Sequence, residues 1–278
     1  LKIDTKEYNM QTVVITGSAR GFGLELARVF KKNNFNVVLS DINETNLKVA
    51  EQTINDISGS GKAISVVADV TNHDALVNLW DTAKQTFGDV DIWINNAGVN
   101  QPDKPVCELE PEEIEFLLNI DVKGTIFGSK IAFLGMKEQG FGQIYNVEGY
   151  GSNDATMMGL SIYGTSKRAV TYFTKALAKE SEILTNNRVC ICTLTPGIMI
   201  TDFIKTANGG KTKIELPERT KKVYNILGDY PNTIAEYCVP RMIKNKKNGY
   251  QVVWLSNRRA FGRFLTAGFK KRDFFSEK

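Results

Sequence analysis

The feature that most constrains this chain is a repeated alternation of short β-branched or apolar runs with longer segments whose apolar residues recur at helical spacing. The runs predicted to be buried strands are residues 11–16, 36–40, 63–68 and 91–94. The segments predicted to be helices are residues 22–32, 43–57 and 72–87, with Asn43 and Asn72 as candidate caps. Repeated strand–helix units predict an α/β fold with a parallel sheet covered by helices on both faces.

The same pattern continues through most of the chain. Helices are predicted at about 111–138 and 160–184, and strands at 143–147, 188–194 and near 251–255. Because no internal repeat or Pro-rich linker marks a boundary, we predict a single Rossmann-type doubly wound parallel sheet of about seven strands within residues 1–257. The Gly- and Lys-rich residues 206–213 are expected to form a mobile loop, where such enzymes often keep a substrate lid.

Composition excludes several classes of protein. With 278 residues, 42% of them apolar and 24% charged, the chain can bury a large core without disulfides. Its four cysteines show no repeated CxxC spacing and no signal peptide begins at Leu1, so a reducing cytoplasm is the expected compartment. His73 is the only histidine, which argues against a His-based zinc site or a Ser-His-Asp triad. We expect no metal site and, since no apolar run is long enough, no membrane span.

Positive charge is concentrated at the carboxyl end. Residues 241–278 contain eleven Lys or Arg against two acidic residues, a balance of +9, although the whole chain carries only +4. The extension at residues 258–278 interleaves aromatic and basic side chains. It can make a peripheral contact with an anionic membrane, or pack on the body or on a second subunit, or remain a solvated tail. No nucleic-acid motif accompanies it, so we expect no nucleic acid partner.

A glycine-rich turn, TGSARGFG at residues 16–23, joins the first predicted strand to the first predicted helix. Glycines at such a place allow a tight turn, close approach of backbone to a phosphate and close packing of helix on strand. An ordinary loop is the alternative, but the placement favours a site for the pyrophosphate of a dinucleotide.

Three further motifs follow the G-x-x-x-G-x-G turn in order along the chain. They are Asn95-Asn96-Ala97-Gly98, Tyr163-Gly164-Thr165-Ser166-Lys167 and Pro196-Gly197. With these motifs, residues 11–255 resemble the short-chain dehydrogenase/reductase family. The resemblance implies an NAD- or NADP-dependent oxidoreductase that transfers hydride between nicotinamide and the carbonyl or alcohol carbon of a small molecule. It also implies a homo-oligomer, a dimer or a tetramer.

The resemblance further implies which residues bind the cofactor. They are Gly17, Ser18, Arg20, Gly21, Phe22, Gly23, Asp41, Asp69, Val70, Asn95, Ala97, Gly98, Tyr163, Lys167, Pro196, Gly197 and Thr201. Asp41 ends the second predicted strand, where a carboxylate can bind the adenosine ribose hydroxyls and repel a 2′-phosphate, so NAD is favoured. Arg20 is the kind of basic residue that NADP-using members often carry, so NADP stays an alternative. Asp41 could instead cap the second helix.

Tyr163 and Lys167 lie four residues apart, so a helix places both side chains on one face. The nearby ammonium is expected to lower the phenol pKa from about 10 towards the working pH. Tyr163 would then exchange a proton with the substrate oxygen, while Lys167 tunes it and holds the nicotinamide ribose.

Two positions depart from the family pattern. Asn146-Val147-Glu148-Gly149 stands where the family has Asn-x-Ser-Ser, so the hydroxyl that holds the substrate oxygen would have to come from Ser152, unless Ser152 only forms a turn. Asp121 stands where the family has a catalytic Asn, and its charge would change the proton balance near Lys167. These departures motivate an alternative function, a catalytically impaired dinucleotide-binding sensor or scaffold.

The segment around these departures is similar to the chlorophyll b reductase branch of the family. The similarity rests on the Asn-x-acid-Gly-x-Gly-Ser segment that ends at Ser152, the Tyr-Gly-x-x-Lys motif and the Pro-Gly-x-x-x-Thr-Asp run at residues 196–202. That branch reduces a ring formyl group to hydroxymethyl, which implies a bulky hydrophobic substrate.

Overall fold

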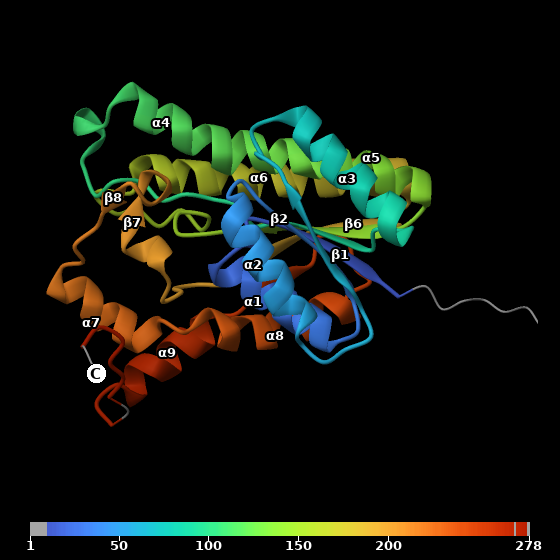
Figure 1. Cartoon of the computed structure of the whole chain (residues 1–278). Helices are drawn as coiled ribbons and strands as arrows, with labels where there is room; N and C mark the ends of the chain where they lie inside the picture. Colours follow the sequence, from blue (N-terminus) through green and yellow to red (C-terminus); the bar gives the residue numbers. More distant parts are fainter. Residues whose placement is uncertain (1–9, 270, 277–278) are drawn as a thin grey trace, which may run out of the picture.

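The computed structural model describes residues 10–269 and 271–276. Its centre is a seven-stranded sheet in the order β3-β2-β1-β4-β5-β6-β9, in which every neighbouring pair is parallel (Figure 1). The strands are β1 (Thr12–Thr16), β2 (Asn36–Asp41), β3 (Ala63–Val67), β4 (Ile92–Asn95), β5 (Gly142–Val147), β6 (Val189–Thr195) and β9 (Gln251–Val253). The predicted doubly wound parallel sheet is confirmed.

The order of the strands reverses between β1 and β4. The chain first moves outward from β1 to β2 and β3, and then returns to β4 on the other side of β1. The strand order therefore reverses at the carboxyl edge between β1 and β4, and open α/β sheets bind ligands in the crevice at such a switch point. The glycine-rich turn and the Asn95–Gly98 motif both lie at this edge.

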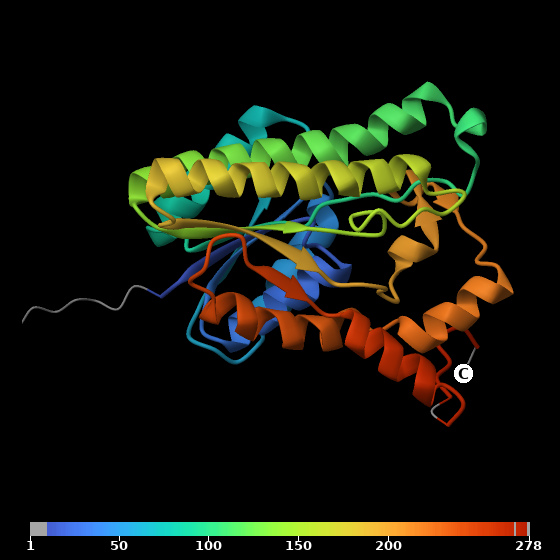
Figure 2. The same cartoon turned by 180° about the vertical axis from the view of Figure 1, so that it is seen from behind.

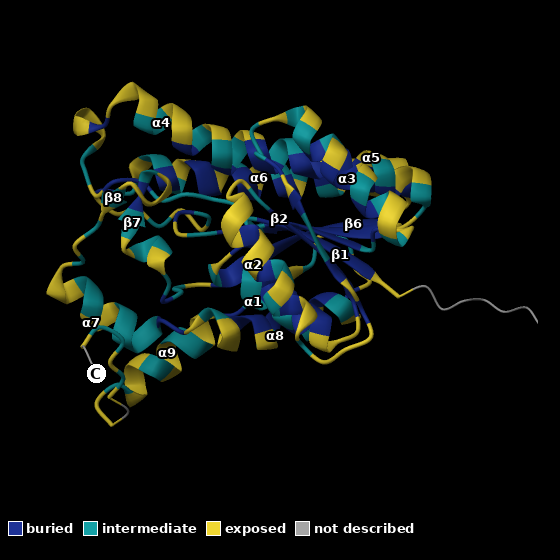
Figure 3. Cartoon of the chain, viewed as in Figure 1, coloured by how far each residue is buried: buried dark blue, intermediate teal, exposed yellow. Residues whose placement is uncertain are grey.

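Helices cover both faces of the sheet (Figure 2). One face packs α1 (Gly21–Lys32), α2 (Glu44–Asn55) and α8 (Pro231–Lys244), and the other packs α3 (His73–Phe87), α5 (Thr125–Gln139) and α6 (Ser161–Thr185). The sheet between them is almost wholly buried (Figure 3). The caps predicted for α2 and α3 are present, because the side chains of Asn43 and Asn72 each accept a hydrogen bond from the backbone of the first turn.

The helix predicted at 111–138 is interrupted. A π-helical turn, η2 (Asn119–Gly124), separates α4 (Pro111–Leu118) from α5. A π-turn shifts the phase of the side chains that follow it and is common at functional sites. Here the turn contains Asp121, whose carbonyl accepts a hydrogen bond of 2.7 Å from the Thr125 hydroxyl.

The structure corrects the expectation for residues 206–213. They contain a short antiparallel ribbon, β7 (Thr206–Ala207) with β8 (Thr212–Lys213), and its residue Asn208 donates a hydrogen bond to Glu113 of α4. The chain continues through α7 (Glu218–Leu227) to α8, and three helices of this part, α7, α8 and α9 (Asn257–Thr266), were not predicted as elements. None of the helices that the structure describes is both long and apolar enough for a bilayer-spanning segment.

The described part of the extension is folded against the body. Asp229, between α7 and α8, forms ion pairs of 2.7 Å with both Arg263 and Arg272 and accepts a hydrogen bond from the Trp254 indole. Phe274 and Phe275 pack on aromatic rings of the α7 region. This segment is therefore not a solvated tail.

Candidate active site

The glycine-rich turn has the geometry that a dinucleotide requires. Gly17 and Gly21 have φ of 62° and 60°, which glycine adopts without strain, and the space beside Gly21 is open. A Cβ on Gly23 would lie 2.4 Å from the Gly17 carbonyl oxygen, so only glycine allows α1 to start this close to β1. The amide of Asn96 donates hydrogen bonds to the carbonyls of Thr16 and Gly17 and fixes the turn from β4. The residues present fit a bound pyrophosphate.

Asp41 lies at the end of β2 beside this turn. Its carboxylate accepts hydrogen bonds from the backbone amides of Ala19 and Asn43, at 3.2 and 3.1 Å. The cap of α2 is Asn43, so the alternative that Asp41 caps this helix is wrong. The Ser18 hydroxyl is buried and bonds to the Ile15 carbonyl, while the side chain of Arg20 lies exposed at the start of α1.

The remaining residues predicted to bind the cofactor lie along the carboxyl edge of the sheet. Asp69 forms a turn by accepting a hydrogen bond from the Thr71 amide, and Val70 packs against Gly124 of η2. Asn95 is buried, and its amide is fully used by Trp93, Ser129 and Asn146. The Asn95 side chain therefore joins β4 to β5 and α5, and the predicted contact of Asn95 with the cofactor stays a prediction.

The loop after β6 borders the same crevice. Gly197 has φ of 74° and lies against Leu255, where a Cβ would approach within 2.5 Å. The preceding Pro196 is buried, and Thr201 begins the short helix η3 (Asp202–Ile204). Phe203 in that helix reaches the Tyr163 ring, with ring centroids 6.0 Å apart.

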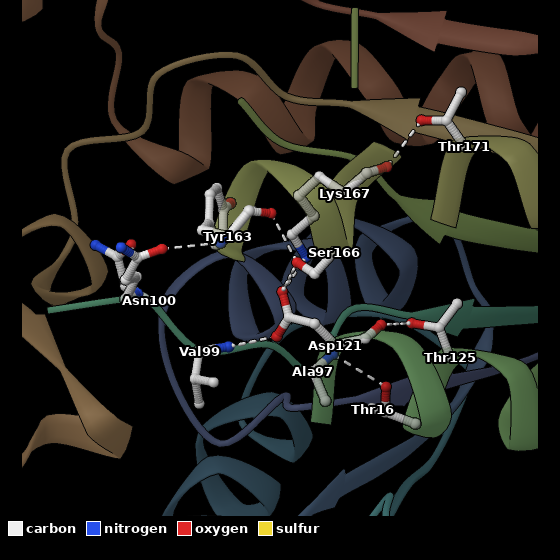
Figure 4. A network of polar contacts seen from close by, with 11 residues as sticks. Thr16, Ala97, Val99, Asn100, Asp121, Thr125, Tyr163, Ser166, Lys167 and Thr171 are labelled. Carbon is white, nitrogen blue, oxygen red and sulfur yellow. Dashed lines mark hydrogen bonds and ion pairs between the residues drawn. The ribbon is translucent and has the colours of Figure 1, made fainter. Parts of the chain in front are cut away.

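Tyr163, Lys167 and Asp121 meet at the centre of the site (Figure 4). The Lys167 ammonium lies 2.8 Å from the Asp121 carboxylate, and both side chains are buried. Asp121 also accepts hydrogen bonds from the Val99 amide at 2.9 Å and from the Ser166 hydroxyl at 3.3 Å. Tyr163 lies one helical turn before Lys167, whose ammonium is 5.4 Å from the centre of the phenol ring.

The pKa of Tyr163 differs from the one predicted from the sequence. Burial raises the pKa of Tyr163 to about 12; Lys167 lowers this pKa, while the negative charge of Asp121 and the nearby Tyr224 raise it. Burial lowers the pKa of Lys167, but the charges of Asp121 and Tyr163 outweigh burial, so the net shift is upward. The predicted lowering of the tyrosine pKa is wrong for the free protein, because burial of the phenol outweighs the effect of Lys167 and the charge of Asp121 adds to the upward shift.

Gln101, which was not predicted as a site residue, fixes the start of α6. Its side-chain oxygen accepts hydrogen bonds from the backbone amides of Ile162 and Tyr163, at 2.8 and 3.0 Å. The residue at the usual cap position, Leu160, has no side chain that could do this. Gln101 is almost completely buried and thus anchors the backbone of Tyr163 from the loop after β4. Its distance of more than sixty positions from Tyr163 hid this contact from any local sequence pattern.

The segment that replaces the family serines lies directly against Tyr163. A Cβ on Gly149 would lie 2.3 Å from the Tyr163 hydroxyl oxygen, so the backbone of Gly149 walls this side of the site. Glu148 is buried, and its two carboxylate oxygens lie 2.7 Å from the Thr171 hydroxyl and 2.6 Å from the Thr195 hydroxyl. The backbone carbonyl of Ser152 accepts a hydrogen bond from Arg168, and in the described part of the chain its hydroxyl has no partner.

Comparisons with known proteins identify the family. A family model described as short chain dehydrogenase matches residues 11–211. A probable chlorophyll(ide) b reductase NYC1, chloroplastic, from Oryza sativa subsp. japonica is 29% identical over 283 residues, which cover 96% of this chain and 54% of that protein. The chlorophyll(ide) b reductase NOL, chloroplastic, of the same organism is 32% identical over 232 residues, covering 83% of this chain and 66% of that protein.

The chain therefore belongs to the short-chain dehydrogenase family and is an oxidoreductase. The similarity to its chlorophyll b reductase branch is confirmed, although the chain spans about half the length of the first of these relatives. Two solved structures share its fold. A 3-ketoacyl-(acyl-carrier-protein) reductase from Brucella melitensis complexed with NADH has a TM-score of 0.75 at 24% identity, covering 90% of this chain and 98% of that one. A metagenomic short-chain oxidoreductase in complex with NADP has a TM-score of 0.70 at 20% identity, covering 87% and 95%.

Proposed function

We propose that the chain reduces a carbonyl group with NADH or NADPH, and that Tyr163 donates the proton. When bound, the reduced nicotinamide supplies the hydride. The observation that carries the proposal is the buried group of Tyr163, Lys167 and Asp121 at the carboxyl edge of the sheet. With a pKa of about 12, Tyr163 is protonated at neutral pH, so it can give its proton to the oxygen of a carbonyl as hydride reaches the carbon.

Each residue of the group has a separate part in this step. Lys167 is the cation next to the phenol and stabilises negative charge that develops on its oxygen. Asp121 orients the ammonium and ties it to the loop after β4 through the Val99 amide. Gln101 holds the backbone of Tyr163. The hydroxyl of Ser152 is the candidate for holding the substrate oxygen. Asp41 lies at the end of β2, where its carboxylate can bind the adenosine ribose hydroxyls, which supports a preference for NADH over NADPH.

The substrate that we propose is a bulky hydrophobic aldehyde, of the formyl tetrapyrrole kind that the names of the two rice relatives describe. The support from the structure is the loop between β5 and α6, which leads from Gly149 to the catalytic helix. Its side chains Tyr150, Met157 and Met158 are 36%, 51% and 78% exposed, so an apolar border adjoins the tyrosine. A flat, apolar ring system can cover such a border.

The test is turnover of purified protein with chlorophyllide b, with a small diketone as the comparison, and with each reduced cofactor. We expect reduction of the formyl group to hydroxymethyl, identified by mass. The Tyr163→Phe variant is the matched control for non-enzymatic reduction. Cofactor binding without turnover of any aldehyde or ketone would instead favour the alternative, a dinucleotide-binding sensor or scaffold.

We also propose that α9 makes a peripheral contact with lipid. Its Arg263 pairs with Asp229 and its Arg259 stacks on Trp254, while Phe261, Phe264 and Leu265 of α9 and Phe269 just beyond it are 66%, 53%, 64% and 92% exposed. A helix with an exposed apolar stripe suits the interface of a membrane. A plastid compartment, which the names of the relatives give for those proteins, is the rival to the expected cytoplasm, and localisation of a fluorescent fusion decides between them. Light scattering tests the expected homo-oligomer.

A further inference from the structure

Glu148 is a buried acid that the proposed chemistry does not use. It lies at the end of β5, next to the glycine that walls the Tyr163 hydroxyl, and is 7% exposed. Its backbone amide donates to the Leu194 carbonyl, which fixes it against β6. The position is one at which the sequence departs from the family pattern, which has a serine there.

Both carboxylate oxygens of Glu148 accept a hydrogen bond from a hydroxyl group, at 2.7 Å from Thr171 and 2.6 Å from Thr195. The ion pairs formed by the described residues do not include Glu148, and the nearby cation, Lys167, is already paired with Asp121. Two carboxylates thus face one ammonium in this buried region. Burying a charge without a counter-charge costs free energy, and a cation close to Glu148 would lower this cost.

The position of Glu148 relative to the proposed cofactor site indicates which cation can lie close to it. Thr171 follows Lys167 by one helical turn, and Thr195 directly precedes Pro196-Gly197. Lys167 and Pro196-Gly197 are among the residues that the family resemblance assigns to the cofactor, Lys167 to the nicotinamide ribose. Glu148 therefore contacts, through Thr171 and Thr195, the two segments that carry these residues. A nicotinamide ring is neutral when reduced and carries a positive charge when oxidised.

We propose that Glu148 supplies a negative charge beneath the nicotinamide, which favours the oxidised ring and so makes the bound reduced cofactor a stronger hydride donor. The inference rests on the proposed function and deepens it, because it assigns a preferred direction to the site. Glu148 acts at a distance, through its charge, as a fixed charge of the protein stabilises charge that develops during a reaction.

The experiment compares the affinities of wild type and Glu148→Gln for NADH and NAD⁺ by calorimetry, or for the NADP pair if that pair binds better. Gln keeps a hydrogen-bonding group for both threonines and removes only the charge. We expect the preference for the oxidised form to fall about tenfold, the size of one nearby unit charge in a protein interior. Binding of ADP-ribose, which has no nicotinamide, should be unchanged.

Two further variants keep the outcome decisive. Asp91→Asn removes a carboxylate that binds the Thr12 amide at the opposite edge of the sheet, and should leave the ratio of affinities unchanged. If Glu148→Gln does not fold, Glu148→Met combined with Thr171→Val replaces both partners by apolar groups and should give the same tenfold change. An unchanged ratio in a folded variant that binds all three ligands would overturn the inference alone. A wild type that binds no nicotinamide dinucleotide would overturn the proposed function as well.

Discussion

The ammonium of Lys167 and the carboxylate of Asp121 form a buried ion pair of 2.8 Å beside the phenol of Tyr163. An amide at position 121, as in the family, would leave the ammonium free to act on the phenol. Burial raises the pKa of Tyr163 most, and the Asp121 carboxylate raises it further against the effect of Lys167. Lys167 therefore stays charged and Tyr163 protonated, which suits proton donation to a carbonyl and opposes proton removal from an alcohol.

The first prediction concerns pH. Alcohol oxidation requires the deprotonated phenol, so its rate rises as the pH passes the pKa of Tyr163. Because the charge of Asp121 raises this pKa, Asp121→Asn should shift the rising limb of kcat/KM to lower pH by about one unit. The profile is measured with the alcohol product and oxidised cofactor, with Asp91→Asn as the control for removal of a remote carboxylate. An unshifted limb would show that Asp121 does not set the acidity of Tyr163.

The second prediction concerns the proton donor. Tyr163→Phe should abolish turnover and leave cofactor affinity nearly unchanged, because only the hydroxyl is lost. Lys167→Ala should damage both turnover and affinity. It should also lower the free energy of unfolding by about 3–5 kcal/mol, because it leaves Asp121 buried without its cation.

The double variant Lys167→Ala with Asp121→Asn separates the structural part of this effect. Removing both charges should recover most of the lost stability and none of the activity. Urea unfolding and initial rates measure the two quantities. Substantial activity of the Phe variant on the true substrate would move the search for the proton donor to Glu148 or Asp121.

The sheet and the helices that cover it could be predicted from sequence because the signals are local and repeated. Each buried strand is a short apolar run in the sequence. The residues that cap α2 and α3 directly precede these helices. The π-turn at Asp121 could not be predicted in this way, because the pattern of apolar residues on either side reads as one helix. The helices α7, α8 and α9 were not predicted as elements. The apolar residues of α9 recur at helical spacing but are exposed, and α7 has no buried residue, so neither helix shows as part of the core.

Site residues that lie within one sequence motif could be predicted. Contacts between segments that are distant in the sequence could not. Tyr163 and Lys167 share a helix face, so their spacing placed them together. The Gln101 contact with α6 and the neutralisation of Lys167 by Asp121 depend on how loops meet at the edge of the sheet. The acidity of Tyr163 depends on burial, which no spacing along the chain reports.

The third prediction concerns the choice of cofactor. NADH should bind more tightly than NADPH, because the Asp41 carboxylate repels a 2′-phosphate. Asp41→Asn should narrow or reverse the preference, and is a better test than Asp41→Ala since the amide can still accept from the Ala19 backbone. Fluorescence titration with both cofactors measures this preference, with Asp91→Asn, which removes a remote carboxylate, as the control. Tighter NADPH binding by the wild type would refute the assignment.

The fourth prediction concerns the missing serine. Ser152→Ala should lower turnover on the order of a hundredfold if its hydroxyl polarises the substrate oxygen. Gly149→Ser, which restores the residue of the family pattern, should lower turnover rather than raise it. The reason is steric, because an added Cβ would lie 2.3 Å from the Tyr163 hydroxyl. Initial rates of both variants decide this, and a small effect of Ser152→Ala would mean that the substrate is oriented without a serine.

The last prediction concerns the exposed stripe on α9. Deleting residues 258–278 is a poor test, because it removes Arg263 and Arg272 and leaves Asp229 buried without its cations. The triple variant Phe261→Ser, Leu265→Ser and Phe269→Ser changes only exposed side chains, at 66%, 64% and 92% exposure, and should fold normally.

Co-sedimentation with vesicles of neutral and anionic lipid at low salt measures the contact. We expect the triple variant to lose binding at least on the order of tenfold, because each apolar side chain gains free energy at the interface. Arg258→Ser should weaken binding to anionic vesicles alone, by about 1 kcal/mol. Ile183→Ser is the matched control, since Ile183 is 82% exposed on α6. Equal binding of the wild type and the triple variant would exclude α9 as a membrane element, and a lower mass of the variant by light scattering would assign the stripe to a second copy of the chain.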